Sequence, residues 1–185
     1  AAGDDGAPQA LWADQAQRAA IQAVLDAGDV ELFGMTYSAG HPGLIGYQRW
    51  VNYALKQNPD TRFFISVPWG DDSSGVSAAQ FETDYEATQA AVHALIDELR
   101  AKFPGVDFYS VPAGRAAVEL YNLYEASNLP DISALVGGPA TSLFSDIQGG
   151  PGNILVAAGD LVWFAAIYDI DLATHEFDPG YSTDI

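Results

Sequence analysis

The segment that could carry chemistry most directly is an acid followed by a glycine-rich turn. Asp146 precedes Gly149, Gly150 and the Pro151-Gly152 pair, and an apolar helix is predicted next, over residues 153–168. In α/β proteins, loops at the carboxyl ends of strands hold ligands and catalytic groups. The two glycines could offer backbone N–H groups to an anion at the helix N-terminus. The segment contains no Lys or Arg, however, so a tight turn is the better account of it.

A second glycine-rich loop contains Ser38 and His41 and follows a strand predicted at residues 30–36. Ser38, His41 and Asp146 could form a triad if the two loops converge. No glycine precedes Ser38 at the position that a nucleophile elbow requires. The Gly and Pro residues around Ser38 are turn formers, and a plain turn is therefore the favoured interpretation.

The strand predicted at residues 62–67 leads into a loop that contains Trp69, Asp71 and Asp72. These two acids could meet Asp146 at the strand ends and hold Ca²⁺ or Mg²⁺, or act as acid and base. A solvated turn is again the favoured interpretation. Trp69 could stack on a sugar ring, or it could close the top of the core.

The remaining histidines, His93 and His175, suggest no metal site. His93 lies within a long predicted helix, where a half-buried histidine is the plain interpretation, and His175 lies in an acidic tail. With 3 histidines and no cysteine in the chain, we expect neither a transition-metal site nor a cofactor. The absence of cysteine also excludes disulfides and a cysteine nucleophile.

Composition bounds the function further. The 185 residues predict one domain, with a loose leader at 1–12 and an acidic tail at 173–185. Against 25 acids stand 7 Lys and Arg, giving a formal charge of −18, which argues against nucleic-acid partners and anionic membrane surfaces. No apolar run approaches the roughly 18 residues of a membrane span. The acidic surface suits a marine or salt-adapted organism, or solubility alone.

The predicted elements alternate between helices and strands. Three strands separated by long helices imply parallel crossovers and a three-layer α/β/α sandwich with a short parallel sheet. The first helix has no clear strand before it, so either residues 1–12, which match a strand pattern poorly, supply a first strand, or a first strand is missing from the chain. The predicted helices cover 14–28, 44–57, 77–103, 115–126 and 153–168; the strands cover 30–36, 62–67 and 106–111; residues 129–144 are expected to be irregular.

Several short motifs occur along the chain in an order that resembles the SGNH (GDSL-like) hydrolase superfamily. The resemblance covers about residues 29–171, and the order and spacing of the motifs carry it. The motifs are Thr36-Tyr37, Gly46-Tyr47-Gln48-Arg49-Trp50, Asn58-Pro59-Asp60-Thr61, Val67-Pro68-Trp69, Leu143-Phe144-Ser145-Asp146, Gly149-Gly150-Pro151-Gly152 and Trp163-Phe164-Ala165-Ala166-Ile167-Tyr168.

This resemblance implies a flavodoxin-like fold and hydrolysis of carboxylic esters, often acetyl esters of carbohydrates. Asp146 matches the acid of the family's last block, but no His follows at positions 148–150. The family's Gly-Asp-Ser and Gly-X-Asn-Asp motifs are also absent. In the family's route the Asp orients the His that acts as the base. Because this chain lacks that His, we expect no hydrolysis by the family's route. A small ester or carbohydrate would be the substrate of an active form.

An alternative is a non-catalytic binding or self-assembling protein on the same fold. A missing first strand would leave a sheet edge that could pair with another copy of the chain, giving a homo-oligomer. The small residues Ala1-Ala2-Gly3 resemble an end left by signal-peptide cleavage, which favours a secreted or periplasmic location.

Overall fold

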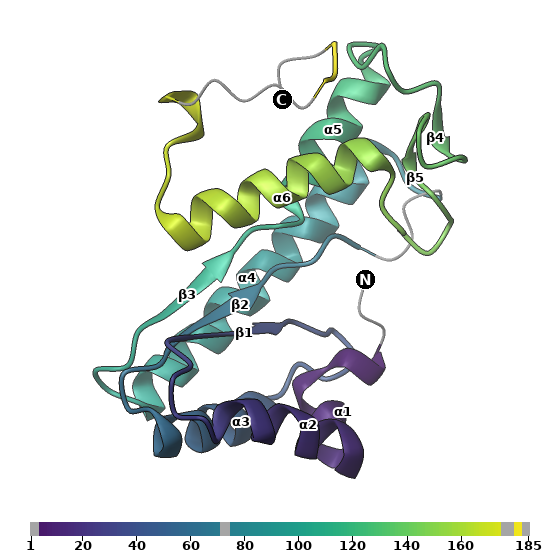
Figure 1. The fold of residues 1–185 in the computed structure, drawn as a ribbon. Helices are drawn as coiled ribbons and strands as arrows, with labels where there is room; N and C mark the ends of the chain where they lie inside the picture. The colour runs from purple at the N-terminus through teal and green to yellow at the C-terminus, as the bar shows by residue number, and fades with distance from the viewer. Residues whose placement is uncertain (1–3, 71–74, 175–179, 183–185) are drawn as a thin grey trace. The chain divides into compact units, whose positions relative to one another are not determined.

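The computed structural model describes residues 4–70, 75–174 and 180–182 (Figure 1). The described residues form a mixed α/β protein with short parallel sheets, as the sequence predicts. The chain packs as two compact units. The first unit contains residues 2–67 and 88–110, and the second contains 68–87 and 111–185. The expectation of a single domain over 1–185 stays a prediction.

The first unit is built on a three-stranded sheet whose strands follow one another in sequence order. These strands are β1 (Leu32–Thr36), β2 (Arg62–Ser66) and β3 (Phe108–Val111), in the order β1-β2-β3. β1 and β2 are parallel, with Leu32 opposite Arg62 and Thr36 opposite Ser66. The apolar run in β2 is buried from Phe63 to Ser66, as expected for a strand inside an α/β core.

A row of phenylalanines marks one face of this sheet. Phe33 and Phe63 lie in edge contact, and Phe63 stacks on Phe108 at 5.3 Å between ring centroids. Trp50 of α3 (Leu44–Gln57) contacts Phe33 on this face. Ser110 lies two residues after Phe108, so its side chain points to the same face. That face meets α4 (Ala78–Lys102), whose residues from 88 onward belong to the first unit.

The N-terminal residues differ from the expected loose leader. A short 3₁₀ turn, Asp4–Gly6, leads into α1 (Pro8–Ala13), and α2 (Gln15–Leu25) follows it. The Trp50 Nε1–H donates to the carbonyl oxygen of Pro8 at 2.8 Å. Trp12 packs edge-on against Trp50 at 4.8 Å. Tertiary contacts therefore order α1, which is too short to show an amphipathic period in the sequence.

The second unit contains a second, smaller parallel sheet where the sequence predicts irregular structure. β4 (Ala134–Val136) pairs with β5 (Ser142–Phe144). α5 (Arg115–Glu125) and α6 (Asn153–Tyr168) flank the pair in the chain, and the short turn η2 (Leu172–Thr174) follows. Phe81, Tyr121 and Phe144 form a cluster of edge-on rings that holds β5 in the core. Each strand has three residues, which is too few for a pattern of alternation to be visible.

The sheet order also bears on the expected missing strand. In flavodoxin-like sheets the first strand lies between the second and the third. Here β1 and β2 pair directly along their full length, so no additional strand fits between them.

Among the described residues, no helix combines the length and apolar character needed to cross a bilayer.

Candidate functional site

The loop around Asp146 is closed by its own hydrogen bonds. One carboxylate oxygen, Asp146 Oδ1, accepts from the backbone N–H groups of Gln148 and Gly150, each at 2.9 Å. Ser145 N–H donates to the Gly150 carbonyl oxygen at 2.7 Å. A Cβ atom at Gly150 would lie within 2.3 Å of Asp146 Oδ2. The glycine is therefore needed for the carboxylate to turn back over the loop.

Trp69, in another segment of the second unit, forms a hydrogen bond to this loop. Its indole N–H donates to the Gly149 carbonyl oxygen at 2.8 Å. Gly149 is buried and adopts a positive φ of 83°, which favours glycine. Trp69, Asp146, Gly149 and Gly150, all predicted site residues, therefore come together. They do so as a closed structural turn whose polar groups bond to one another.

Ser38 and His41 come together in the first unit, where they form a backbone turn. His41 N–H donates to the Ser38 carbonyl oxygen at 3.1 Å. Tyr47 Oη accepts from Ser38 N–H at 3.4 Å and donates to the Thr36 carbonyl oxygen at the same distance. Burial raises the pKa of the Tyr47 hydroxyl to about 12, so it is a hydrogen-bonding group and not a base at neutral pH. These contacts fit the turn interpretation of this loop.

The candidate cation site rests partly on residues that the structure does not describe. Asp71 and Asp72 lie outside the described residues, as does His175. Within the ranges that are described, no three His, Asp or Glu side chains gather closely enough to hold a metal ion.

A pairing that sequence reasoning missed joins α4 to β3. His93 Nε2 lies 3.2 Å from Ser110 Oγ, within hydrogen-bonding distance. Both side chains line a pocket of about 360 Å³ together with Ile96, Asp97, Arg100 and Tyr109. His93 is exposed and Ser110 is half-buried, so a solvent-borne molecule can reach both. All six residues belong to the first unit.

Arg100 brings a fixed positive charge to this pocket. Its Nη2 donates to the Phe108 carbonyl oxygen at 2.6 Å, and its Nη1 lies 3.4 Å from Asp97 Oδ1. These two contacts anchor the guanidinium between α4 and β3. A guanidinium has five N–H donors in all, so an anchored Arg100 retains capacity to donate to a bound molecule.

The pocket therefore contains the parts of a simple acyl-transfer site. A serine hydroxyl becomes a competent nucleophile when an adjacent base takes its proton. Neutral His93, with its proton on Nδ1, can accept the Ser110 proton at Nε2. The nearby guanidinium can stabilise negative charge that develops on a carbonyl oxygen.

A signal for this pocket is present in the sequence. His93, Asp97 and Arg100 follow the spacing i, i+4, i+7, which places them on one face of a helix. Ser110 meets this helix face only if its side chain points to the helix side of the sheet and the helix packs over that part of the strand. A single sequence shows neither of these two features.

Comparisons with protein-family models, with curated proteins and with solved structures find no match to this chain. The structure itself defines the class of protein as α/β with short parallel sheets.

Proposed function

We propose that this chain is a divergent SGNH-hydrolase-like protein whose strand order departs from the flavodoxin-like one, and that it hydrolyses small carboxylic esters with Ser110 and His93. The observation that carries the activity is the 3.2 Å contact between Ser110 Oγ and His93 Nε2 inside a ligand-sized pocket. The sequence motifs given above support the relationship. The closed loop at Asp146 is consistent with a route that differs from the family's own, because the Asp146 carboxylate already accepts hydrogen bonds from backbone N–H groups of the loop.

The reaction would run in two steps. In the first, His93 Nε2 takes the Ser110 hydroxyl proton while Oγ attacks the ester carbonyl carbon. The carbon–oxygen bond to the alcohol breaks, and the alcohol leaves with the proton from His93. In the second, His93 takes a proton from water, the hydroxide attacks the acyl-serine, and the carboxylic acid is released as Ser110 regains its proton. Arg100, which lines the same pocket, would stabilise the oxyanion of each step.

The negative charge of the protein restricts which substrates the site would accept. A chain with a net charge of −18 repels anionic molecules. The Asp97 carboxylate in the pocket offsets the charge of Arg100. Small neutral esters, such as acetyl esters of alcohols or sugars, are therefore the substrates that the site would accept best.

Hydrolysis of p-nitrophenyl acetate by purified variants tests the proposal. Ser110→Ala and His93→Gln should each lower the rate by about 100-fold or more, the usual contribution of a general base. Ser38→Ala, His41→Gln and Asp146→Asn should change it by less than about twofold, within ordinary context effects. Retention of the full rate in Ser110→Ala, or its loss in Ser38→Ala, would overturn the assignment.

Self-assembly is a second candidate, favoured by the position of β1. β1 ends the sheet order, and four of its five residues are half-exposed. Edge strands of this kind can pair with a second copy of the chain. A stable oligomer on light scattering at micromolar concentration would support this role, and a monomer under those conditions would rule it out.

A further inference from the structure

An apolar groove lies between α5 and α6 of the second unit. Its volume is about 350 Å³, and its walls are formed by aliphatic side chains. From α5 come Ala116, Leu120 and Leu123, and from α6 come Ala158, Leu161 and Val162. This volume falls within the range of about 300–1,000 Å³ that small-molecule sites in proteins occupy.

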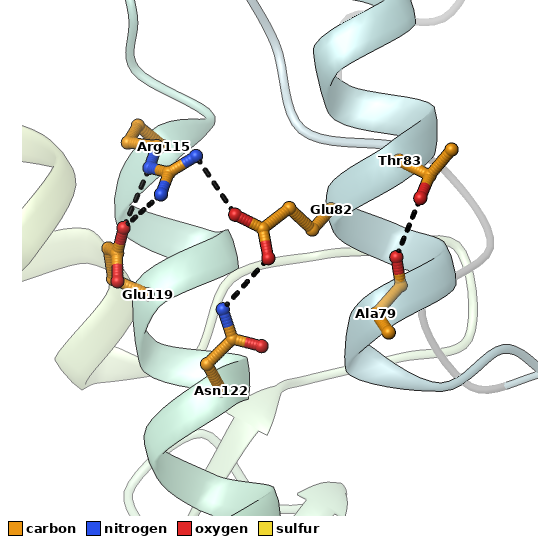
Figure 2. Close-up of polar contacts among 6 residues, drawn as sticks. All are labelled: Ala79, Glu82, Thr83, Arg115, Glu119 and Asn122. Atoms are coloured by element: carbon orange, nitrogen blue, oxygen red, sulfur yellow. Dashed lines mark hydrogen bonds and ion pairs between the residues drawn. The ribbon is translucent and has the colours of Figure 1, made fainter.

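Ionised side chains define one end of the groove. Arg115 and Glu119 line it, and Arg115 Nε donates to Glu119 Oε1 at 2.7 Å. Arg115 also forms an ion pair with Glu82 at 3.2 Å (Figure 2). Asn122 Nδ2 donates to the other carboxylate oxygen of Glu82 at 3.3 Å. Two carboxylates, one of them at the groove, thus share one guanidinium, which leaves a net charge of −1 on this cluster of Arg115, Glu119 and Glu82.

The charge of this end excludes anionic ligands. Arg115 is held between two carboxylates, and both raise its pKa against the lowering effect of desolvation. It is therefore fully charged but already engaged. A carboxylate or phosphate ligand would have to displace Glu119 or Glu82 and would meet the field of a strongly acidic protein. A cationic group in the groove instead meets the Glu119 carboxylate, whose side chain is 56% accessible, while Glu82 pairs with Arg115 and offsets the charge of its guanidinium.

We propose that this groove binds a small hydrophobic ammonium compound, with its apolar body between α5 and α6 and its ammonium group against the Glu119 carboxylate. Burial of the apolar body supplies most of the affinity, and the carboxylate selects the sign of the head group. This site is independent of the ester hydrolysis proposed above, because its residues belong to the other unit.

Isothermal titration calorimetry with two matched probes tests the inference. The probes are 1-naphthylmethylammonium and 1-naphthaleneacetate, which share a ring and differ in charge. The ammonium probe should bind at least about tenfold more tightly than the carboxylate probe, a difference of about one decade in Kd. Equal binding of the two probes, or no binding of either, would overturn the proposal.

Variants locate the site. Val162→Trp fills the groove and should abolish binding of the ammonium probe, while far-UV circular dichroism confirms folding. Glu119→Gln removes a partly exposed charge without changing shape and should weaken binding by about three- to tenfold. Glu98→Gln, an exposed acid of the first unit, controls for general attraction to an acidic protein and should leave binding unchanged. If Glu98→Gln weakens binding as much as Glu119→Gln does, the groove is not the site.

Discussion

Two buried tyrosines of the second unit differ in what their hydroxyl groups contact. Tyr121 Oη donates to the Val76 carbonyl oxygen at 2.6 Å. Tyr85 Oη is buried and has no hydrogen-bond partner of good geometry among the described residues. A buried polar group without a partner costs free energy, whereas a satisfied one contributes modestly to stability.

These contacts predict that replacing tyrosine by phenylalanine changes the free energy of unfolding differently at the two positions. Tyr121→Phe should lower the free energy of unfolding by about 1 kcal/mol, because a hydrogen bond is lost and a carbonyl oxygen is left without its donor. Tyr85→Phe should leave the free energy of unfolding unchanged or raise it slightly. Urea unfolding of the two variants and the parent protein measures both values. Equal destabilisation by the two substitutions would contradict the assignment of the contacts.

Buried tyrosines also predict how stability depends on alkaline pH. Burial raises the pKa of Tyr47 and of Tyr85 from 10 to about 12. Between pH 10 and pH 12 the unfolded chain loses these protons while the folded chain keeps them, so the folded state is destabilised as the pH rises. Each retained proton lowers the free energy of unfolding by about 1.4 kcal/mol per pH unit. Urea midpoints measured at pH 9, 10 and 11 test this. The midpoint should hold up to pH 10 and then fall, and Tyr47→Phe should reduce the slope above pH 10.

Among the elements, α1 shows how a short segment is held in place by packing. Gly46 of α3 allows close approach, because a Cβ atom there would lie 2.5 Å from the backbone nitrogen of Gln9. Gly46→Ala should therefore force α1 away from α3 and lower the free energy of unfolding by about 1–3 kcal/mol, as overpacking does.

Gly43, the residue before α3, provides a matched control for this substitution. A Cβ atom at Gly43 has no neighbour within 4 Å, and Gly43 has a φ of −74° and a ψ of 146°, a backbone conformation that alanine adopts without strain. Gly43→Ala should therefore be close to neutral in the same unfolding assay. A neutral Gly46→Ala would mean that α1 does not pack against α3 as described.

The elements that could be predicted from sequence are the long and strongly patterned ones. α3 occupies the predicted residues 44–57, and α4 begins after Ser77, whose Oγ accepts from Gln80 N–H as an N-cap. The residues at 8–13 and the β4–β5 pair were missed, since contacts far along the chain stabilise them. The candidate pocket was missed for the same reason: His93 and Ser110 are 17 residues apart and meet only when the helix packs on its strand. Asp146, Gly149 and Gly150 were named as site candidates because of their types, with a tight turn as the favoured account of the glycines, and their hydrogen bonds form such a turn.

For the whole molecule, net charge is the dominant physical property. At −18 over 185 residues, mutual repulsion opposes the compact state. Raising the ionic strength from about 0.1 M to about 1 M shortens the screening length from about 10 Å to about 3 Å. The thermal midpoint should therefore rise with NaCl, which circular dichroism can follow.

Sucrose at matched osmolality separates this electrostatic effect from general solute exclusion, because it stabilises proteins without screening charge. NaCl should raise the midpoint by clearly more than sucrose does. A midpoint that falls with NaCl, or that rises equally in the two solutes, would show that repulsion between acids does not limit stability.

We propose Ser110 as the reactive serine of this protein and His93 as the base that activates it. The most direct measurement is covalent labelling: the protein is treated with p-nitrophenyl acetate, quenched in acid and digested, and the acetylated residue is identified by mass spectrometry. We predict acetyl-Ser110 as the main product, strongly reduced in His93→Gln. An acetyl group found chiefly on Ser38, or labelling of Ser110 that His93→Gln leaves unchanged, would contradict the account.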